Sequence, residues 1–383
     1  MIIKFKNLGP IESGEIDFND LKGINLIIGK NNTGKTYLSN FIYTVLRNIR
    51  IERMLKIDDL SKKMRSMGKR EGDNFSDELC ETDLPFVFHT NKKCFENTEI
   101  NIEFDEKDKF TENEKYFLEN IEINNTCFFP AERSGAILFY NQLLENRNNI
   151  LRQLELSQDI NLLKDISRYS EPVNEYIIRL NKLEEYENKE ETEIYRNLVK
   201  NINIQNIIEG EIIIRSNQII YKNENDLKLN MGLVSSTVKT LAGFFLYLKF
   251  QAQKGDIVFI DEIELNLHPE NQRKIMKLIN YLSKQGIKFI ISTHSPVITQ
   301  EMNNMIMFEK CKDKIDDEII KEYSIDRENY GLRQEDVNIY FLNNKTIEQA
   351  EFVEDGVITE TFNEVLGEID NLYQELLFAM EEE

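Results

Sequence analysis

The stretch from Ile24 to Leu46 constrains the fold of this chain more than any other. A continuous apolar run, Ile24 to Ile28, is typical of a strand that is buried on both faces of a sheet. The turn GKNNTGKT follows at once, and from Thr36 onward the apolar residues recur with the period of about 3.6 residues that marks an amphipathic helix. Strand, glycine turn and helix in direct succession predict an α/β fold.

The turn fits the pattern G-x-x-x-x-G-K-[ST]. Its glycines let successive backbone N–H groups and the helix N-terminus point at phosphate oxygens, Lys35 would reach the β- and γ-phosphates, and the Thr36 hydroxyl would ligate Mg²⁺. A plain glycine turn before a helix is the alternative. The sequence therefore predicts ATP and Mg²⁺ as ligands. The candidate nucleotide-binding residues are Gly29, Lys30, Asn31, Asn32, Thr33, Gly34, Lys35, Thr36 and Tyr37.

Two further apolar strands end in residues that suit phosphoryl chemistry. Asp261 and Glu262 follow Ile257 to Ile260, at the carboxyl end where a parallel sheet presents its ligand crevice. Asp261 would hold hydrated magnesium together with Thr36, and Glu262 would polarise the attacking water, although acids also end strands as helix caps. His294 follows the third strand and could donate a hydrogen bond to the γ-phosphate. The candidate catalytic residues are Lys35, Glu262 and His294.

A serine-rich turn, Leu233 to Thr237, precedes a helix predicted over Val238 to Phe250. Free N–H groups and hydroxyls at a helix N-terminus form an anion site, so Ser235, Ser236 and Thr237 are also candidate nucleotide contacts. Taken alone, the turn is merely a helix cap. With the glycine turn, however, one chain would own two phosphate-binding surfaces, which two copies can share.

Composition limits the partners and the compartment. The 68 acidic and 47 basic side chains give a formal net charge of −21, which disfavours coating nucleic acid or an anionic membrane by bulk charge. No stretch approaches the about 20 consecutive apolar residues of a membrane span, and the first residues do not resemble a signal peptide. The four cysteines are scattered without metal-ligand spacing. We therefore expect a cytoplasmic protein without a membrane partner.

These motifs, in this order, resemble the ABC-type ATPases of the soluble branch that includes SMC proteins, RecF and the overcoming-lysogenization-defect (OLD) family. GKNNTGKT resembles the Walker A loop, LVSST the signature, VFIDEIELNLHP the Walker B segment and D-loop, and STHSP the switch histidine. Within that branch, CFFPAERS and the serine signature look most like ATPase subunits of bacterial antiphage systems of the Septu, Gabija and retron-associated kind.

The resemblance implies a P-loop NTPase fold, with a mixed or parallel central sheet, antiparallel N-terminal strands and a helical insertion lobe. We expect the first part of the ATPase head at 1–135, the lobe at 136–210, the second part of the head at 211–345 and an acidic tail at 346–383. It also implies a homodimer, or a dimer of dimers, in which each ATP lies between the Walker A loop of one copy and the signature of the other. Two departures would slow hydrolysis: Thr237 replaces the signature glycine, and no Q-loop glutamine is evident. Glu132 or Arg133 lies near that place, or the pair caps a helix.

Two functions follow as hypotheses. The first is an ATP-hydrolysing sensor or scaffold of an antiphage defence complex whose effector, such as a nuclease, is a separate chain, because nothing after His294 offers a nuclease domain of Toprim size. The second is a DNA-maintenance ATPase of RecF or SMC character. Its support is the basic cluster from Lys62 to Arg70, which an exposed charged helix also explains and explains better. A transporter ATPase would need a Gly-Gly signature that the sequence lacks.

Overall fold

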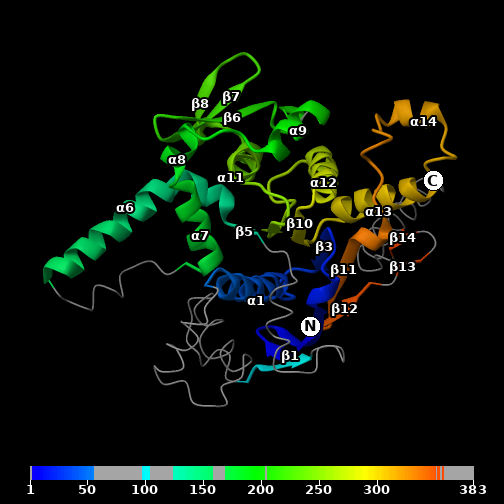
Figure 1. Ribbon diagram of the computed structural model, residues 1–383, viewed down its shortest axis with the longest axis horizontal. Helices are drawn as coiled ribbons and strands as arrows, with labels where there is room; N and C mark the ends of the chain where they lie inside the picture. Colours follow the sequence, from blue (N-terminus) through cyan, green and yellow to red (C-terminus); the bar gives the residue numbers. More distant parts are fainter. Residues whose placement is uncertain are drawn as a thin grey trace, which may run out of the picture.

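The computed structural model describes residues 2–55, 97–103, 124–157, 169–202, 205–350, 352–353 and 356–357. Three segments lie outside these ranges: the basic cluster from Lys62 to Arg70, the run from Phe86 to Phe88, whose apolar residues predict a strand, and the end of the acidic tail, whose sequence predicts an amphipathic helix up to Glu383. A central sheet divides the described part into two helical sides, and the N-terminal strands lie at one end of the sheet (Figure 1). None of the described helices is long and apolar enough to cross a bilayer.

The central sheet has nine strands among the described residues. In spatial order they are β4 (Glu99–Glu103), β1 (Ile2–Leu8), β2 (Ile11–Asp17), β12 (Thr346–Gln349), β11 (Val337–Asn343), β3 (Ile24–Gly29), β10 (Lys288–Thr293), β9 (Ile257–Ile260) and β5 (Thr126–Phe129). Neighbouring strands from β11 to β5 pair in parallel, whereas β1 pairs antiparallel with both β2 and β4. The predicted α/β class, with antiparallel strands at the N-terminus, is therefore confirmed.

Strand β3 is buried along its whole length because the sheet is covered on both faces. Ile24, Leu26 and Ile28 belong to an apolar core that includes α11 (Ser236–Phe250), α12 (Pro269–Lys284) and α13 (Pro296–Cys311). Ile27 joins a second core, formed with α1 (Lys35–Leu55) and the N-terminal strands. Alternate side chains of a strand point to opposite faces, so a single apolar run serves both cores.

A set of helices precedes the signature helix α11 in the chain. They are α6 (Arg133–Ser157), α7 (Glu171–Leu180), α8 (Leu183–Glu187), α9 (Glu193–Asn201) and α10 (Gln205–Ile208), and we call them the lobe helices. Ser170 immediately precedes α7, and Pro172 lies in its first turn, where the missing N–H costs little. Helix α6 contacts both α7 and α11 and extends away from the sheet (Figure 1).

The remaining elements frame the head. A small antiparallel sheet consists of β6 (Gly210–Arg215), β7 (Gln218–Asn223) and β8 (Lys228–Asn230). The alternation of apolar and polar residues at Glu211 to Arg215 and Gln218 to Tyr221 predicts its hairpin of β6 and β7. The other elements are the helix α14 (Asp317–Glu322), the 3₁₀ turns at Phe18–Asp20, Met231–Leu233 and Gln334–Asp336, and the short strands β13 (Phe352–Val353) and β14 (Gly356–Val357). No sequence pattern predicted β8, β12, β14, α13 or α14.

Candidate functional site

The carboxyl ends of four neighbouring parallel strands bring distant segments of the chain to one edge of the sheet. Phe129 is in register with Ile260, and Ile260 with Ile291. Two residues further along β10, Thr293 is in register with Ile28 of β3. The segments that follow β5, β9, β10 and β3 therefore leave the sheet side by side. Such an edge is where open α/β sheets bind ligands.

The Walker A loop, Gly29 to Thr36, is shaped by its glycines. Gly34 adopts a φ of +105°, and a Cβ at this position would lie 2.7 Å from Ile11 Cγ1, so no other residue fits without strain. The buried Lys35 donates hydrogen bonds of 2.9 Å from Nζ to the carbonyls of Gly29 and Lys30. Burial lowers the pKa of Lys35, while the nearby carboxylates counteract this shift.

Thr36 and Asp261 meet although 225 residues separate them in the chain. The Thr36 Oγ1 donates a hydrogen bond of 2.9 Å to Asp261 Oδ2. Ser292 donates to the other oxygen, Oδ1, and Asp261 itself is buried. A hydroxyl beside a carboxylate at the mouth of a phosphate-binding loop provides the hard oxygen ligands that Mg²⁺ takes, so these residues fit the predicted ion.

The acidic turn, Asp261 to Glu264, follows β9 and is held by contacts with its backbone. Glu262 has a φ of +48°, a left-handed conformation that is uncommon outside glycine. The Glu262 N–H donates a 2.9 Å hydrogen bond to Ser292 Oγ. The buried Arg133 donates from Nη1 to the Asp261 carbonyl at 2.6 Å and from Nη2 to the Glu262 carbonyl at 2.7 Å. Arg133 thus lies at the acidic turn, whereas Glu132 beside it is exposed.

Glu264 holds the predicted switch histidine. Its Oε1 accepts a 2.7 Å hydrogen bond from the His294 N–H and lies 2.9 Å from His294 Nδ1, and Thr293 Oγ1 donates to its Oε2 at 2.7 Å. Burial pushes the pKa of Glu264 upward, but the hydrogen bonds from His294 and Thr293 outweigh burial and lower it. The contact with Glu264 raises the pKa of His294. The sequence pattern did not reveal this role of Glu264, although the residue lies within the Walker B segment VFIDEIELNLHP.

The serine turn, Leu233 to Thr237, is placed differently. Ser235 caps α11, with its Oγ accepting a hydrogen bond of 3.3 Å from the Val238 N–H, and Thr237 Oγ1 donates to the Asn266 carbonyl. Ser235 and Ser236 are exposed, and Leu233 is 71% exposed. In the part of the chain that the structure describes, no hydrogen bond joins this turn to the Walker A loop. The two predicted phosphate surfaces are therefore not joined in one copy.

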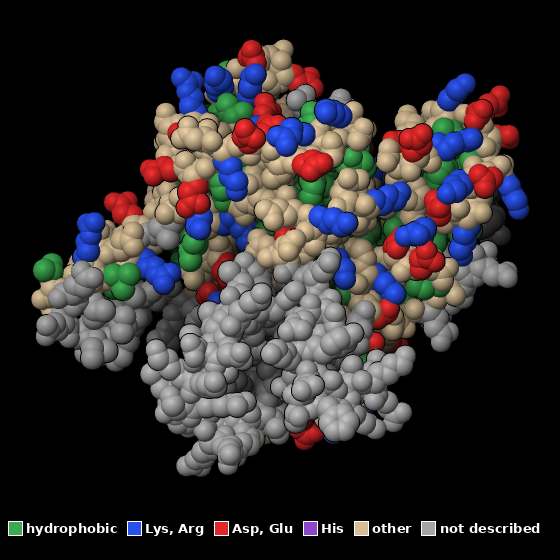
Figure 2. Space-filling view, viewed as in Figure 1, with side chains coloured by type: hydrophobic (Ala, Val, Ile, Leu, Met, Phe, Trp, Pro, Cys, Tyr) green, Lys and Arg blue, Asp and Glu red, His purple; other side chains and the backbone are tan. Residues whose placement is uncertain are grey.

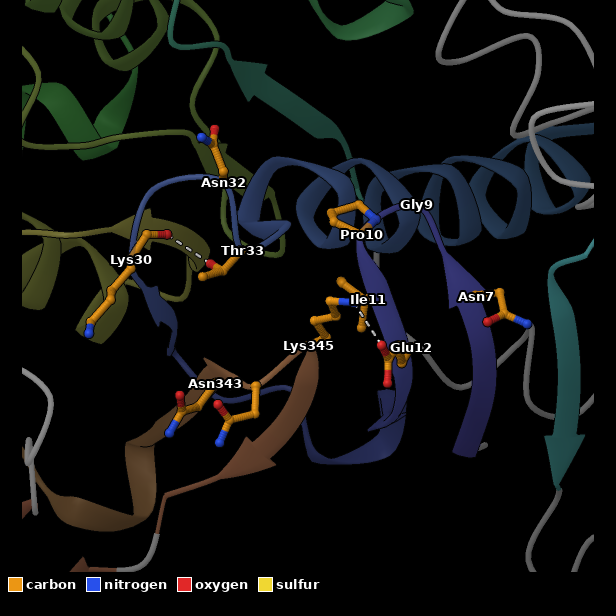
Figure 3. A pocket seen from close by; sticks show the side chains of 11 residues that line it. Asn7, Gly9, Pro10, Ile11, Glu12, Lys30, Asn32, Thr33, Asn343 and Lys345 are labelled. Carbon is orange, nitrogen blue, oxygen red and sulfur yellow. Dashed lines mark hydrogen bonds and ion pairs between the residues drawn. The ribbon is translucent and has the colours of Figure 1, made fainter.

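A cavity of about 460 Å³ adjoins the outer side of the Walker A loop (Figure 3). Three segments line it: the loop itself, the turn between β1 and β2, and the turn between β11 and β12. The Lys345 Nζ and Glu12 Oε1 form an ion pair of 2.9 Å between two of these segments. The predicted contact Tyr37 is not among the lining residues. Its ring packs on the neighbouring turn instead, where a Cβ on Gly9 would lie 2.4 Å from the ring.

A glycine loop between a parallel strand and a helix, with a Thr–Asp pair and an acidic turn at the same sheet edge, is the arrangement of a P-loop ATPase fold. The chain belongs to the AAA_21 family, described as "AAA domain, putative AbiEii toxin, Type IV TA system", whose model matches residues 24–299. None of the curated proteins compared matches the chain.

Solved structures of similar fold include heads and cassettes of two kinds. The SMC head domain of Thermotoga maritima is 11% identical, over 92% of this chain and 98% of that chain, with a TM-score of 0.35. The Smc head of Pyrococcus furiosus, bound to the C-terminal domain of ScpA, is 14% identical over 96% and 98%, with a TM-score of 0.36. The cbiO1 protein of Clostridium perfringens, part of the ABC transporter complex cbiONQ, is 12% identical over 99% and 98%, with a TM-score of 0.31.

Proposed function

We propose that this protein binds ATP with Mg²⁺ and hydrolyses it to ADP and phosphate. The observation that supports this most is the contact between Thr36 and Asp261, because it joins the predicted metal ligands from two distant segments beside Lys35. The backbone N–H groups of the Walker A loop would receive the phosphates, and the Lys35 ammonium would neutralise the β- and γ-oxygens. The adjoining cavity would accommodate the base and ribose.

The same edge supplies groups for hydrolysis. Thr36 and Asp261 would hold Mg²⁺, which when bound neutralises charge that develops on the phosphate oxygens. Glu262, partly exposed at the turn, would orient and polarise the attacking water. Glu264 would aim His294, so that the imidazole donates a hydrogen bond to the γ-phosphate.

The functional unit that we propose is a homodimer, which could pair further into a dimer of dimers. The serine turn lies at the start of a fifteen-residue helix, its serines are exposed, and no described hydrogen bond joins it to the Walker A loop of the same copy. A two-fold arrangement would set this turn against the nucleotide of the second copy and cover Leu233. ATP would then hold two copies together, and hydrolysis would release them.

In the cell, we propose a sensor or scaffold subunit of a bacterial antiphage defence complex with a separate protein effector such as a nuclease. The family's description names a toxin of a Type IV TA system, which supports a role in a system of several components. The DNA-maintenance alternative depends on the cluster from Lys62 to Arg70, outside the described residues. On the described surface that Figure 2 shows, basic and acidic side chains are interspersed, which does not favour a nucleic-acid track.

Phosphate release by the purified protein with ATP and Mg²⁺ tests the biochemical proposal, with Glu262→Gln as the inactive comparison. Co-expression of Glu262→Gln with its neighbouring reading frames tests the cellular proposal, because the trapped ATP form should retain its effector. Recovery of a nuclease or toxin in an ATP-dependent complex is expected. Neighbouring frames that encode only repair or housekeeping proteins, together with salt-sensitive DNA retention, would instead favour the alternative.

A further inference from the structure

Arg133 is a buried arginine whose hydrogen bonds go to main-chain carbonyls of the site. It is 2% exposed, and its guanidinium donates to the carbonyls of Pro130, Asp261 and Glu262 at 2.6–3.0 Å. A buried charge is costly unless it is well hydrogen-bonded, so such an arginine fixes the groups that satisfy it. Two of its three acceptors belong to the proposed metal ligand and the proposed base.

These contacts hold the Glu262 backbone from both sides. Arg133 Nη2 binds the Glu262 carbonyl at 2.7 Å, while Ser292 Oγ accepts from the Glu262 N–H at 2.9 Å. The left-handed φ of +48° between these two bonds sets the direction in which the side chain leaves the turn. Without the guanidinium, the peptide after Asp261 can rotate toward a commoner conformation and carry the carboxylate with it.

The arginine itself is anchored by the lobe helices. It is the first residue of α6, which packs on α7 and on the signature helix α11. Tyr176 of α7 fits over Gly243 of α11, where a Cβ would lie 2.2 Å from the Tyr176 hydroxyl oxygen. The Tyr176 ring also meets Phe129 of β5 edge-on, with 5.9 Å between centroids. The guanidinium therefore approaches the acidic turn from a tightly packed base.

We propose that Arg133 is a positioning residue for ATP hydrolysis: its guanidinium holds the acidic turn in the conformation that aims the Glu262 carboxylate. This inference rests on the proposed function and deepens it. It assigns to the lobe a direct part in the chemistry, because the helix α6 supplies the group that sets the base. Arg133 need not touch ATP.

The test compares Arg133→Lys and Arg133→Ala with Arg47→Ala. Arg47 of α1 pairs with Glu171 and Glu175 of the lobe helix α7, so it controls for general loosening of the lobe. We expect both Arg133 variants to bind a fluorescent ATP analogue within about threefold of the parent while kcat falls by about 30- to 300-fold. Arg47→Ala should keep kcat within about threefold. Lysine preserves the charge but cannot span the three carbonyls, so Arg133→Lys decides the matter even where Arg133→Ala is unstable.

Guanidinium ion supplies a readout that a merely structural arginine would not move. Tens of millimolar guanidinium chloride should raise kcat of Arg133→Ala by about tenfold over the same ionic strength of NaCl, and should not rescue Glu262→Gln. Parent-like kcat in Arg133→Lys, an equal loss in Arg47→Ala, or absence of rescue in a folded Arg133→Ala would each overturn the positioning role. Failure of the parent to bind or hydrolyse ATP would instead reject the proposed function.

Discussion

The Walker A loop and the serine turn are both helix N-termini suited to phosphate, yet the fold treats them in opposite ways. The loop precedes α1 at the sheet edge, where Lys35 is buried and Thr36 bonds to Asp261. The turn precedes α11 on the surface, where Ser235 caps its own helix and Leu233 is exposed. The two helix N-termini thus share the same local chemistry, but the Walker A loop lies among other polar groups of the sheet edge, whereas the serine turn is exposed on the surface.

This difference teaches that an anion site is defined by what surrounds a helix N-terminus. Around the loop, β9 and β10 contribute acids, hydroxyls and an imidazole, so the site has the parts for both binding and chemistry. Around the serine turn, Ser235 caps α11 and Thr237 donates a hydrogen bond to the Asn266 carbonyl. If the turn binds phosphate, the rest of its site must come from another molecule.

Removing the ammonium of the Walker A loop should have the largest effect of all. Lys35→Ala should weaken binding of a fluorescent ATP analogue by about 100-fold or more, because the Lys35 ammonium is held against the carbonyls of Gly29 and Lys30, inside the phosphate-binding loop. Lys274→Ala, which removes an exposed pair with Glu270 on α12, is the matched control. Equal affinities in the two variants would show that the loop does not hold phosphate.

Glu262→Gln should separate ATP binding from ATP hydrolysis at the site around the Walker A loop. The amide keeps the shape of the side chain but cannot polarise water, so phosphate release should fall by about 100- to 1,000-fold while ATP affinity stays within a few-fold. Glu270→Gln, on the exposed start of α12, is the control. Parent-like turnover in Glu262→Gln would mean that another group is the base.

Ser236→Arg should impair the serine turn and leave the Walker A loop of the same copy unchanged. Ser236 is exposed, so the variant should fold and bind nucleotide in each copy with affinity within about threefold of the parent. Its bulk should prevent ATP-dependent dimerisation in light scattering, and turnover should fall by about tenfold or more. A variant that dimerises and hydrolyses ATP like the parent would remove the serine turn from the nucleotide site.

The smallest effect concerns the pair of Glu264 and His294 and depends on pH. The raised pKa of His294 contributes stability that is present below its ordinary value of 6.5 and is lost as pH rises through the raised value. The lowered pKa of Glu264 contributes stability above its ordinary value of 4.5, which is lost at lower pH. The melting temperature of the parent should therefore exceed that of Glu264→Gln most near about pH 5.5, with an advantage about 1–3 °C larger there than near pH 9. A pH-independent difference would contradict this coupling.

Local patterns predicted much of the fold, because buried strands and amphipathic helices can be recognised from the order of apolar and polar residues within a short segment. The strands β3, β9 and β10 and the helix α1 follow directly from apolar runs and periodicity. Contacts between distant segments carry no such pattern. That Arg133 reaches carbonyls 128 and 129 residues away, or that Glu264 holds His294, depends on strand order, which places β5 and β10 on either side of β9. Strand β12 was missed because its four residues are only partly buried or exposed.

Mixing two inactive variants tests most directly whether the Walker A loop and the serine turn that bind one ATP come from different copies. Lys35→Ala keeps an intact serine turn, and Ser236→Arg keeps an intact Walker A loop. In a mixed dimer, one of the two composite sites is whole and neither variant forms an ATP-bound dimer with itself, so an equal mixture should recover up to about half of parental phosphate release. Release that never exceeds the sum of the two separate variants, in a mixture shown to exchange subunits, would contradict a shared site.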